Sequence, residues 1–238
     1  MWCGILILDA NSTDMKSTVL ITLLVSCGTA FGQRNYDTLP NLPEHYVKRY
    51  ELFKKEPVEK GRIIFVGNSI TEGGNWKVLL RDTTVVNRGI SGDVTFGVIH
   101  RLQEIIDRKP GKVFLLIGIN DLSRNTPDEV IVENIFAIAG KIRSGSRKTT
   151  LYVQSILPTN ETFNNLYKNF VGKGEHVLTI NEQLRKYAKK LKYTYVDLYT
   201  EFLDGEGRMN AKFTSDGLHL SPAGYSHWVE ILKREKYL

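Results

Sequence analysis

Cysteine is nearly absent from this chain of 238 residues, and its two cysteines, Cys3 and Cys27, both lie within the first 32 residues. If that segment is removed as a leader, the mature chain has no cysteine. Disulfide bonds, cysteine nucleophiles and thiolate metal sites are then excluded together. Long apolar runs are also lacking: Thr18–Val25 is shorter than the about 20 apolar residues that a membrane-spanning helix needs.

The first 32 residues have the pattern of a secretory signal peptide. A lysine precedes the apolar run, and Ala30 and Gly32 are small residues where a signal peptidase reads the chain. We expect translation from Met15, cleavage before Gln33, and a secreted or periplasmic protein. The alternative is a membrane-tethered lipoprotein, because the residues leading to Cys27 resemble a bacterial lipobox and would place a lipid anchor on that cysteine.

Charge of one sign does not dominate either. The chain has 32 Lys and Arg against 26 Asp and Glu, a formal net charge of +6, and the basic residues are scattered along the sequence. A nucleic-acid-binding domain concentrates its basic residues on one face or stripe, so we expect no nucleic-acid partner. A flavodoxin-like nucleotide binder using the Gly89–Gly92 loop is disfavoured, because the chain lacks G-x-G-x-x-G and P-loop motifs.

Short runs that are apolar on both faces alternate with helical patterns, as parallel strands covered on both sides require. The runs are Arg62–Val66, Thr84–Val86, Lys112–Ile119, Thr149–Ile156 and Tyr193–Leu198. Apolar stripes with a spacing of three and four residues predict helices over Val94–Ile106 and Val177–Leu191. The alternation predicts a single α/β domain over residues 33–238, a three-layer α/β/α sandwich of about five parallel strands.

Two further helix starts are marked by their capping residues. Thr126 is expected as an N-cap with Pro127 at the first helical position, and Ser221 with Pro222 opens the last helix in the same way. Between two of the predicted strands and helices, the polar segment 157–174 has weak periodicity. It predicts a long surface loop beside a strand end.

A single serine stands out at the first of the predicted strand ends. In open parallel sheets the ligand crevice lies outside the carboxyl ends of the strands, and Ser69 follows the first strand directly in I-I-F-V-G-N-S-I-T-E-G-G. A serine hydroxyl needs a base within hydrogen-bond reach to become a nucleophile. Four of the five histidines fall on predicted helices or their edges, where surface or packing roles are the common ones: His45, His100, His176 and His227.

His219 differs from these because it lies in a loop, in S-D-G-L-H-L-S-P, three residues after Asp216. On a tight turn, residues three apart can face each other. Asp216 can then accept a hydrogen bond from one imidazole nitrogen while the other nitrogen faces Ser69, which is the arrangement of an activated serine. A metal site at Asp216 and His219 is disfavoured, because no third ligand accompanies them at a suitable spacing.

Acyl transfer also requires hydrogen-bond donors where negative charge develops on the carbonyl oxygen. The Ser69 backbone N–H is one candidate. Gly92 lies in a loop in which the lack of a side chain permits close approach, and the Asn120 side chain follows the third predicted strand. The sequence therefore nominates an oxyanion hole of Ser69, Gly92 and Asn120.

Four blocks of the chain together resemble the SGNH, or GDSL, hydrolase family. They are G-N-S-I-T-E, N-R-G-I-S-G-D, G-I-N-D and D-G-L-H, in the family's order and over nearly the whole mature chain. The resemblance implies a flavodoxin-like fold, Ser69 as nucleophile, Gly92 and Asn120 in the oxyanion hole, His219 as general base and Asp216 as its orienting acid. It is closest to the platelet-activating-factor acetylhydrolase-like and carbohydrate-esterase branches, and it implies no cofactor.

The chain departs from the family pattern at one position, where Asn68 replaces the aspartate before the serine. Asparagine keeps the shape and the acceptor but drops the charge. The block also differs from the G-x-S-x-G elbow, because Thr71 stands in place of its second glycine. We therefore expect the serine on a more open turn than in the elbow.

The sequence thus predicts a secreted serine esterase that removes short acyl groups, such as acetyl, from a carbohydrate or similar polar ester. A lysophospholipase or acyl-glycerophospholipid esterase, and a broad arylesterase, would use the same residues. From another class, a non-catalytic domain that binds a carbohydrate or a partner would keep the fold alone. Candidates for the rim of the crevice are Trp76, Asp93, Phe96, Asn160 and Tyr167, and ordinary packing or a surface position fits each of them equally well.

Overall fold

Five parallel strands form the centre of the structure, a computed structural model that describes residues 42–238. The sheet order is β2-β1-β3-β4-β5. The strands are β1 (Ile63–Gly67), β2 (Val86–Gly89), β3 (Lys112–Leu116), β4 (Thr150–Gln154) and β5 (Thr194–Val196). The predicted α/β fold with about five parallel strands is confirmed. The signal peptide and Cys27 lie outside the described residues, so those expectations stay predictions.

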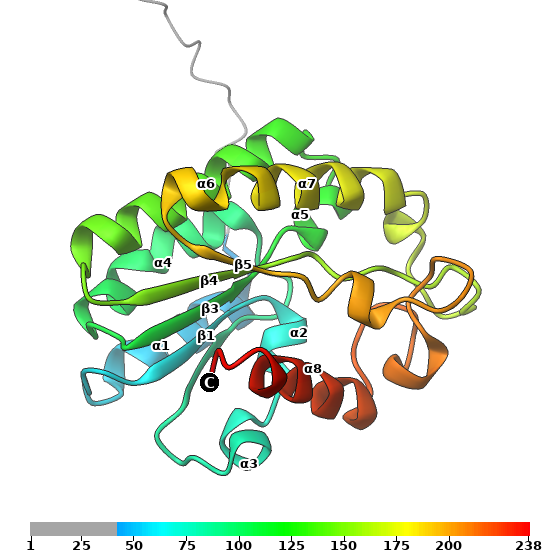
Figure 1. Ribbon diagram of the computed structural model, residues 1–238. Coiled ribbons are helices and arrows are strands. Elements are labelled where there is room, and N and C mark those ends of the chain that lie inside the picture. Colours follow the sequence, from blue (N-terminus) through cyan, green and yellow to red (C-terminus); the bar gives the residue numbers. More distant parts are fainter. Residues whose placement is uncertain (1–41) are drawn as a thin grey trace, which may run out of the picture. The chain divides into compact units, whose positions relative to one another are not determined.

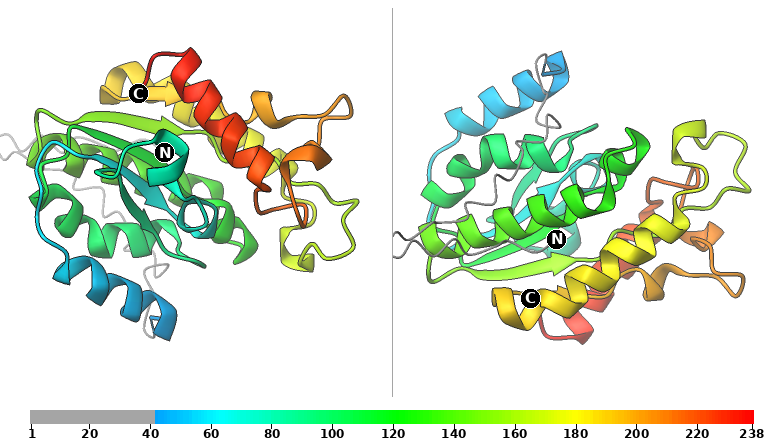
Figure 2. Two further views of the ribbon diagram at one scale, coloured as in Figure 1. Left: turned by 90° about the horizontal axis from the view of Figure 1, so that it is seen from below. Right: turned by 90° about the horizontal axis from the view of Figure 1, so that it is seen from above.

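Helices cover both faces of this sheet (Figures 1 and 2). One layer is built of α1 (Glu44–Lys55), α4 (Thr95–Asp107), α6 (Asp128–Gly145) and α7 (Gly174–Leu191), packed side by side in that order. The other face is covered by α3 (Trp76–Leu80) and α8 (Pro222–Arg234). The short elements α2 (Ser69–Glu72), α5 (Ile119–Ser123), η1 (Lys168–Phe170), η2 (Thr200–Phe202) and η3 (Ala211–Phe213) complete the fold.

An aromatic stack crosses the sheet beneath α3 and α8. The Phe65 ring lies parallel to Trp76 at a centroid distance of 3.8 Å and to Phe114 at 4.9 Å, and Phe114 continues the stack to Tyr152 at 4.5 Å. The edge of Trp228 from α8 meets Trp76 at 4.8 Å. Trp76 is 1% exposed, so its expected place at the rim of the crevice is wrong. Its large apolar surface is buried in the core instead.

Two glycines let α2 lie directly against the carboxyl ends of the strands. A Cβ on Gly67 would lie 2.2 Å from the Leu116 carbonyl oxygen and 2.3 Å from Thr71 Oγ1, and a Cβ on Gly89 would lie 2.1 Å from the Glu72 nitrogen. No side chain fits at either position. The first turn after β1 is therefore pressed against β2 and β3, which fixes the position of Ser69.

Several element ends differ from the sequence-based expectation. The second strand begins at Val86 and not at Thr84, because Asp82 Oδ1 accepts hydrogen bonds from the Thr84 N–H and Oγ1 and holds Thr84 in a turn. The helix expected to be capped by Thr126 begins at Asp128, with Pro127 at the N-cap position and no side-chain cap. Ser221, by contrast, caps α8 as expected by accepting from the Gly224 N–H.

Within residues 42–238, none of the helices combines the length and the apolar character needed to cross a bilayer.

Candidate active site

Ser69 is the first residue of α2, immediately after β1. Asn68 precedes it as the N-cap, and its Oδ1 accepts a hydrogen bond from the Ile70 N–H at 3.0 Å. The aspartate of the family pattern would make the same contact, so asparagine preserves the turn without the charge. The Tyr225 hydroxyl of α8 donates to the Ile70 carbonyl oxygen at 2.9 Å and secures α2 from the other side.

The imidazole of His219 lies between Ser69 and Asp216. Its Nε2 is 3.0 Å from Ser69 Oγ, and its Nδ1 is 2.6 Å from Asp216 Oδ2. Asp216 Oδ1 also accepts from the Leu218 and His219 backbone N–H groups, at 2.9 and 2.7 Å. Burial raises the pKa of Asp216, but these hydrogen bonds and the imidazole outweigh burial and hold it below its usual value. Asp216 is thus ionised at neutral pH, and it sets His219 to accept a proton at Nε2.

Asn160 supports the loop that carries Asp216 and His219. Its backbone N–H donates to the Gly217 carbonyl oxygen at 2.8 Å, and its side-chain amide donates to the Met209 carbonyl oxygen at 2.7 Å. Asn160 is only 2% exposed. The expectation that it lines the rim is therefore wrong, and the long segment after β4 acts as a brace for the loop. Gly217 has a φ of +86°, and a Cβ there would meet the Asn160 carbonyl oxygen.

Three hydrogen-bond donors lie at the ends of β1, β2 and β3. The Ser69 N–H opens α2, where a helix has no internal acceptor for it. The Gly92 N–H makes no hydrogen bond to any described residue, and Gly92 has a φ of +76° with open space where a Cβ would be. Asn120, on α5, uses one amide hydrogen to bind the Asp93 carbonyl oxygen at 2.9 Å. Its second amide hydrogen remains for a ligand.

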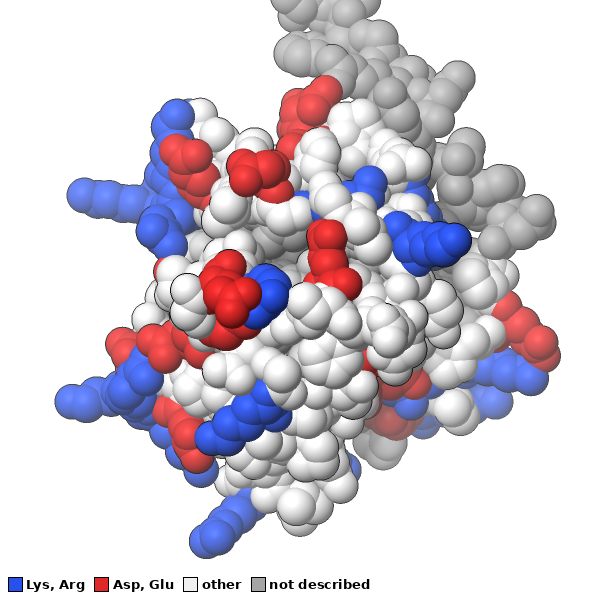
Figure 3. Space-filling model, turned by 90° about the vertical axis from the view of Figure 1, so that its right-hand side faces the viewer, with Lys and Arg blue, Asp and Glu red and all other residues white. Residues whose placement is uncertain are grey.

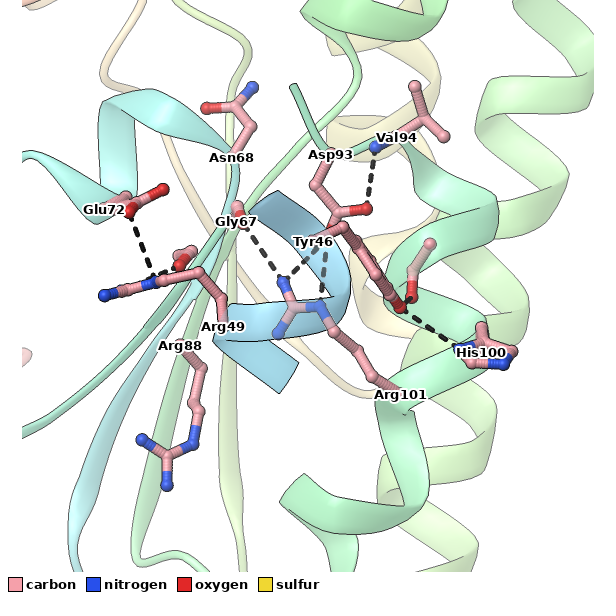
Figure 4. Close-up of polar contacts among 12 residues, drawn as sticks. Tyr46, Arg49, Gly67, Asn68, Glu72, Arg88, Asp93, Val94, His100 and Arg101 are labelled. Carbon is pink, nitrogen blue, oxygen red and sulfur yellow. Dashed lines mark hydrogen bonds and ion pairs between the residues drawn. The ribbon is translucent and has the colours of Figure 1, made fainter. Parts of the chain in front are cut away.

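A buried ion pair connects these strand ends (Figure 4). Arg101 Nη2 lies 2.8 Å from Asp93 Oδ2 and donates to the Gly67 carbonyl oxygen at 3.1 Å, and both charged side chains are 1% exposed. The loop after β2 is thereby tied to the end of β1, two residues before Ser69. Asp93 is thus an internal anchor, and its expected place on the rim is wrong.

A second buried carboxylate, Asp121, ties the end of β3 to the start of α4. It accepts hydrogen bonds from the Thr95 N–H at 3.1 Å and from Thr95 Oγ1 at 2.6 Å. Burial raises the pKa of Asp121 to about 7. Asn120 is its neighbour in sequence, so this contact also fixes the third donor.

The surroundings of Ser69 are open. Ser69 is half-buried, and the side chains of His219 and Asp216 are 35% and 25% exposed. Of the two remaining rim candidates, Phe96 is half-buried and Tyr167 is exposed. Ser69 lines none of three cavities of about 440, 540 and 570 Å³, and the first of them is bordered by Glu72 and Gly73 at the end of α2.

The face at the carboxyl ends of the strands carries acidic and basic side chains interspersed with uncharged surface (Figure 3). Over residues 42–238, no group of three His, Cys, Asp or Glu side chains is arranged to hold a metal ion. His100, His176 and His227 lie on α4, α7 and α8, as expected, and His45 lies on α1.

The model of the GDSL-like lipase/acylhydrolase family matches residues 65–227. The chain belongs to this family. It is 24% identical over 182 residues to an arylesterase from Vibrio mimicus, covering 75% of this chain and 80% of that protein. It is 28% identical over 171 residues to platelet-activating factor acetylhydrolase IB subunit alpha2 from Rattus norvegicus, covering 69% and 71%.

A solved structure from Streptococcus pneumoniae, described as a platelet activating factor, is similar to this GDSL-family chain. It has 30% identity and a TM-score of 0.70, over 80% of this chain and 90% of that one. The resemblance read from the four sequence blocks is confirmed at the level of the family. Together with these relatives, the family identifies the protein as a carboxylic ester hydrolase.

Some residues that shape the site were not recognised from the sequence. The position of Glu72 near the site could have been predicted from the sequence. It lies three residues after Ser69 in a segment that starts a helix, and residues three apart share a face of a helix. Arg101 and Asp121 carry no such signal. Their partners, Gly67 and Thr95, lie 34 and 26 residues away in sequence, and only the packed fold brings them together.

Proposed function

We propose that this GDSL-family hydrolase is a serine esterase that uses a Ser69–His219–Asp216 triad to remove short acyl groups from a polar ester. The observation that carries the proposal is the continuous hydrogen-bonded line from Ser69 Oγ through His219 to Asp216, with distances of 3.0 and 2.6 Å. Three donors at neighbouring strand ends complete the arrangement that acyl transfer requires.

In the first half of the reaction, Ser69 Oγ bonds to the ester carbonyl carbon and passes its proton to His219 Nε2. The carbonyl electron pair moves to oxygen, and the resulting charge is held by the N–H groups of Ser69 and Gly92 and by the Asn120 amide. The intermediate then breaks its bond to the alcohol oxygen. The alcohol leaves with the proton from Nε2, and the acyl group stays on Ser69.

In the second half, water attacks the acyl carbon while giving a proton to His219 Nε2. The same three donors hold the second oxyanion. When the bond to Ser69 Oγ breaks, that oxygen takes the proton back and the carboxylic acid is released. Asp216 stays ionised throughout and stabilises the imidazolium that forms twice in each cycle. No cofactor enters these steps.

The openness of the site supports a short acyl group on a bulky polar alcohol, such as an acetylated carbohydrate. A long acyl chain is bound by burying its apolar surface, and Ser69 lines none of the three cavities of about 440, 540 and 570 Å³. A triad whose His219 and Asp216 side chains are 35% and 25% exposed leaves room for a leaving group larger than the site itself. The relative named platelet-activating factor acetylhydrolase supports acetyl as the acyl group.

The test compares acetate release from acetylated glycans with hydrolysis of p-nitrophenyl acetate, long-chain p-nitrophenyl esters and acyl-glycerophospholipids. We expect turnover of the acetyl esters and little of the long-chain ones. Ser69→Ala should abolish turnover, whereas Ser226→Ala, an exposed serine on α8, should leave it unchanged. Undiminished hydrolysis by Ser69→Ala would refute the triad. Faster hydrolysis of the acyl-glycerophospholipid would indicate that the substrate is a lipid ester and not a polar ester.

We also propose that the protein is exported through the leader that ends before Gln33. Mass measurement of the protein from a secreting host tests this directly. A mature chain starting at Gln33 would support a cleaved signal peptide, and a chain starting at a lipid-modified Cys27 would support the lipoprotein alternative.

A further inference from the structure

The loop that carries Gly92 is held mainly by hydrogen bonds. Ser91 and Gly92 are both exposed, and among residues 42–238 no atom outside Gly92 and its chain neighbours lies within 4 Å of the place where a Cβ of Gly92 would be. Among the described residues, hydrogen bonds to the loop are therefore the main restraint on the direction of the Gly92 N–H. Oxyanion stabilisation depends on that direction, because the donor must already point at the developing charge.

Arg124 Nη2 donates to the Gly92 carbonyl oxygen at 2.9 Å, and Glu72 supplies a second restraint, on the residue that precedes Gly92. Glu72 is the last residue of α2, the helix that Ser69 begins. Its Oε2 accepts a hydrogen bond from the Ser91 N–H at 2.5 Å and a second from Ser91 Oγ at 2.7 Å. One turn of helix thus connects the serine to the residue that precedes Gly92 in the loop.

The carboxylate of Glu72 is itself held in place by α1. Arg49 Nε lies 3.2 Å from Oε1, and His45 Nε2 lies 3.1 Å from Oε2. Arg49 also donates from Nη2 to the Gly89 carbonyl oxygen at 3.1 Å, at the end of β2 (Figure 4). The Glu72 side chain is only 17% exposed, so water competes weakly for these contacts.

Glu72 is ionised at neutral pH. Burial raises its pKa, but the hydrogen bonds from Ser91 and His45 and the charge of Arg49 outweigh burial, and the pKa lies below its usual value. An ionised carboxylate only accepts hydrogen bonds, which matches the two donors that Ser91 presents. Such charge-assisted contacts are shorter and stronger than neutral ones.

We propose that Glu72 is a positioning residue that holds the Ser91–Gly92 loop so that the Gly92 N–H points into the oxyanion hole. Glu72 does not touch the reacting atoms. It acts through Ser91, and it links the position of the donor to the helix that carries the nucleophile. This inference rests on the proposed esterase function and adds to it a residue outside the triad and the three donors.

The test measures kcat and KM separately for Glu72→Ala, Glu72→Gln and Ser91→Ala with p-nitrophenyl acetate. Loss of a whole oxyanion donor costs roughly 100- to 1,000-fold in rate. A donor that remains but is no longer held should cost less, so we expect kcat of Glu72→Ala to fall by roughly 10- to 100-fold with KM nearly unchanged. Glu72→Gln keeps one acceptor oxygen and should recover part of the loss, and Ser91→Ala, which keeps its N–H, should lose only a few-fold.

Asp82→Ala is the matched control. Asp82 Oδ1 also accepts from a backbone N–H and a hydroxyl, those of Thr84 at 2.8 and 2.7 Å, but at the other end of β2. Its kcat should equal that of the wild type. The unfolding free energy of every variant is measured alongside, so that loss of fold is distinguished from loss of positioning. If Glu72→Ala does not fold, the same comparison between Glu72→Gln and Ser91→Ala decides.

A kcat of Glu72→Ala within about twofold of the wild type would overturn the inference, and so would a rise in KM at constant kcat. The Ser69→Ala variant keeps this outcome separate from failure of the proposed function. If wild type is active and Ser69→Ala is not, the triad stands and only the role of Glu72 is refuted. If Ser69→Ala is as active as the wild type, both proposals fall.

Discussion

Asp216→Asn is expected to lower kcat about 10,000-fold while leaving the fold intact, because it reverses one hydrogen bond. Asp216 Oδ1 would keep the Leu218 and His219 backbone N–H groups, at 2.9 and 2.7 Å. At the other position an amide NH₂ would replace the oxygen that faces His219 Nδ1 at 2.6 Å. An NH₂ group donates, so Nδ1 must become the acceptor and the proton moves to Nε2.

The His219 Nε2–H would then face Ser69 Oγ at 3.0 Å and could not accept its proton. Substitutions of this kind in serine triads cost about 10,000-fold in kcat, which corresponds to about 5.5 kcal/mol of barrier at about 1.4 kcal/mol per tenfold. Steady-state hydrolysis of p-nitrophenyl acetate at pH 7 measures the effect, with circular dichroism to verify the fold.

Asp204→Asn is the control for this substitution. Asp204 has the same pattern of contacts, with Oδ1 accepting from the Glu206 and Arg208 N–H groups and Oδ2 facing a side chain, that of Arg208. It faces no histidine, so its kcat should not change. If Asp216→Asn kept more than about a tenth of the wild-type kcat, the tautomer argument would be refuted.

Four other substitutions test parts of the site and of the fold. Asn120→Ala should reduce kcat by roughly 100- to 1,000-fold in the same ester assay, because it removes one oxyanion donor; a loss below about fivefold would exclude Asn120 from that role. Asp121→Asn should gain stability relative to the wild type as pH rises. Burial raises the pKa of Asp121 from 3.8 to about 7. Between pH 3.8 and about 7 the folded wild type therefore holds a proton on Asp121 that the unfolded chain has lost, and the wild type loses stability as pH rises through this range. Asp121→Asn carries no such proton, so the variant does not share this loss. Urea unfolding at pH 5 and pH 8 measures the difference, and a gain that does not depend on pH would contradict the assignment. Gly67→Ala should destabilise the fold by at least about 1–3 kcal/mol, since its Cβ would overlap the Leu116 carbonyl oxygen. Gly140→Ala on α6, where a Cβ meets nothing, should instead raise the melting temperature.

The sequence predicted the sheet because buried parallel strands are apolar on both faces, a pattern that does not depend on distant residues. All five strands were found, but their ends were set by local polar contacts. The turn at Asp82 makes β2 begin later in the sequence than predicted. The third strand ends earlier than predicted, because Gly118 has a φ of 130° and α5 begins at Ile119. Such contacts depend on side-chain geometry, which periodicity does not contain.

The sequence predicted the candidate residues and the hydrogen-bonded order of Asp216, His219 and Ser69, but not the buried contacts that surround them. Ser69, His219 and Asn120 were recognisable because each is a polar side chain in a loop directly beside a predicted strand or helix. The positions of the rim candidates were not predictable, because the sequence around Trp76 or Asn160 does not distinguish a surface position from a buried one. The buried ion pair of Asp93 and Arg101 could not be predicted from the sequence, because its role depends on a contact with the distant Gly67 carbonyl oxygen.

The partial exposure of Ser69, His219 and Asp216 has a consequence for the proposed esterase reaction. If Ser69 carries an acyl group as proposed, that group would lie within reach of bulk solvent, and the concentration of each nucleophile would largely decide which one releases it. Added alcohols should then compete with water and leave as new esters. The protein would be an acyltransferase in methanol–water mixtures, and its product ratio would report how open the site is in solution.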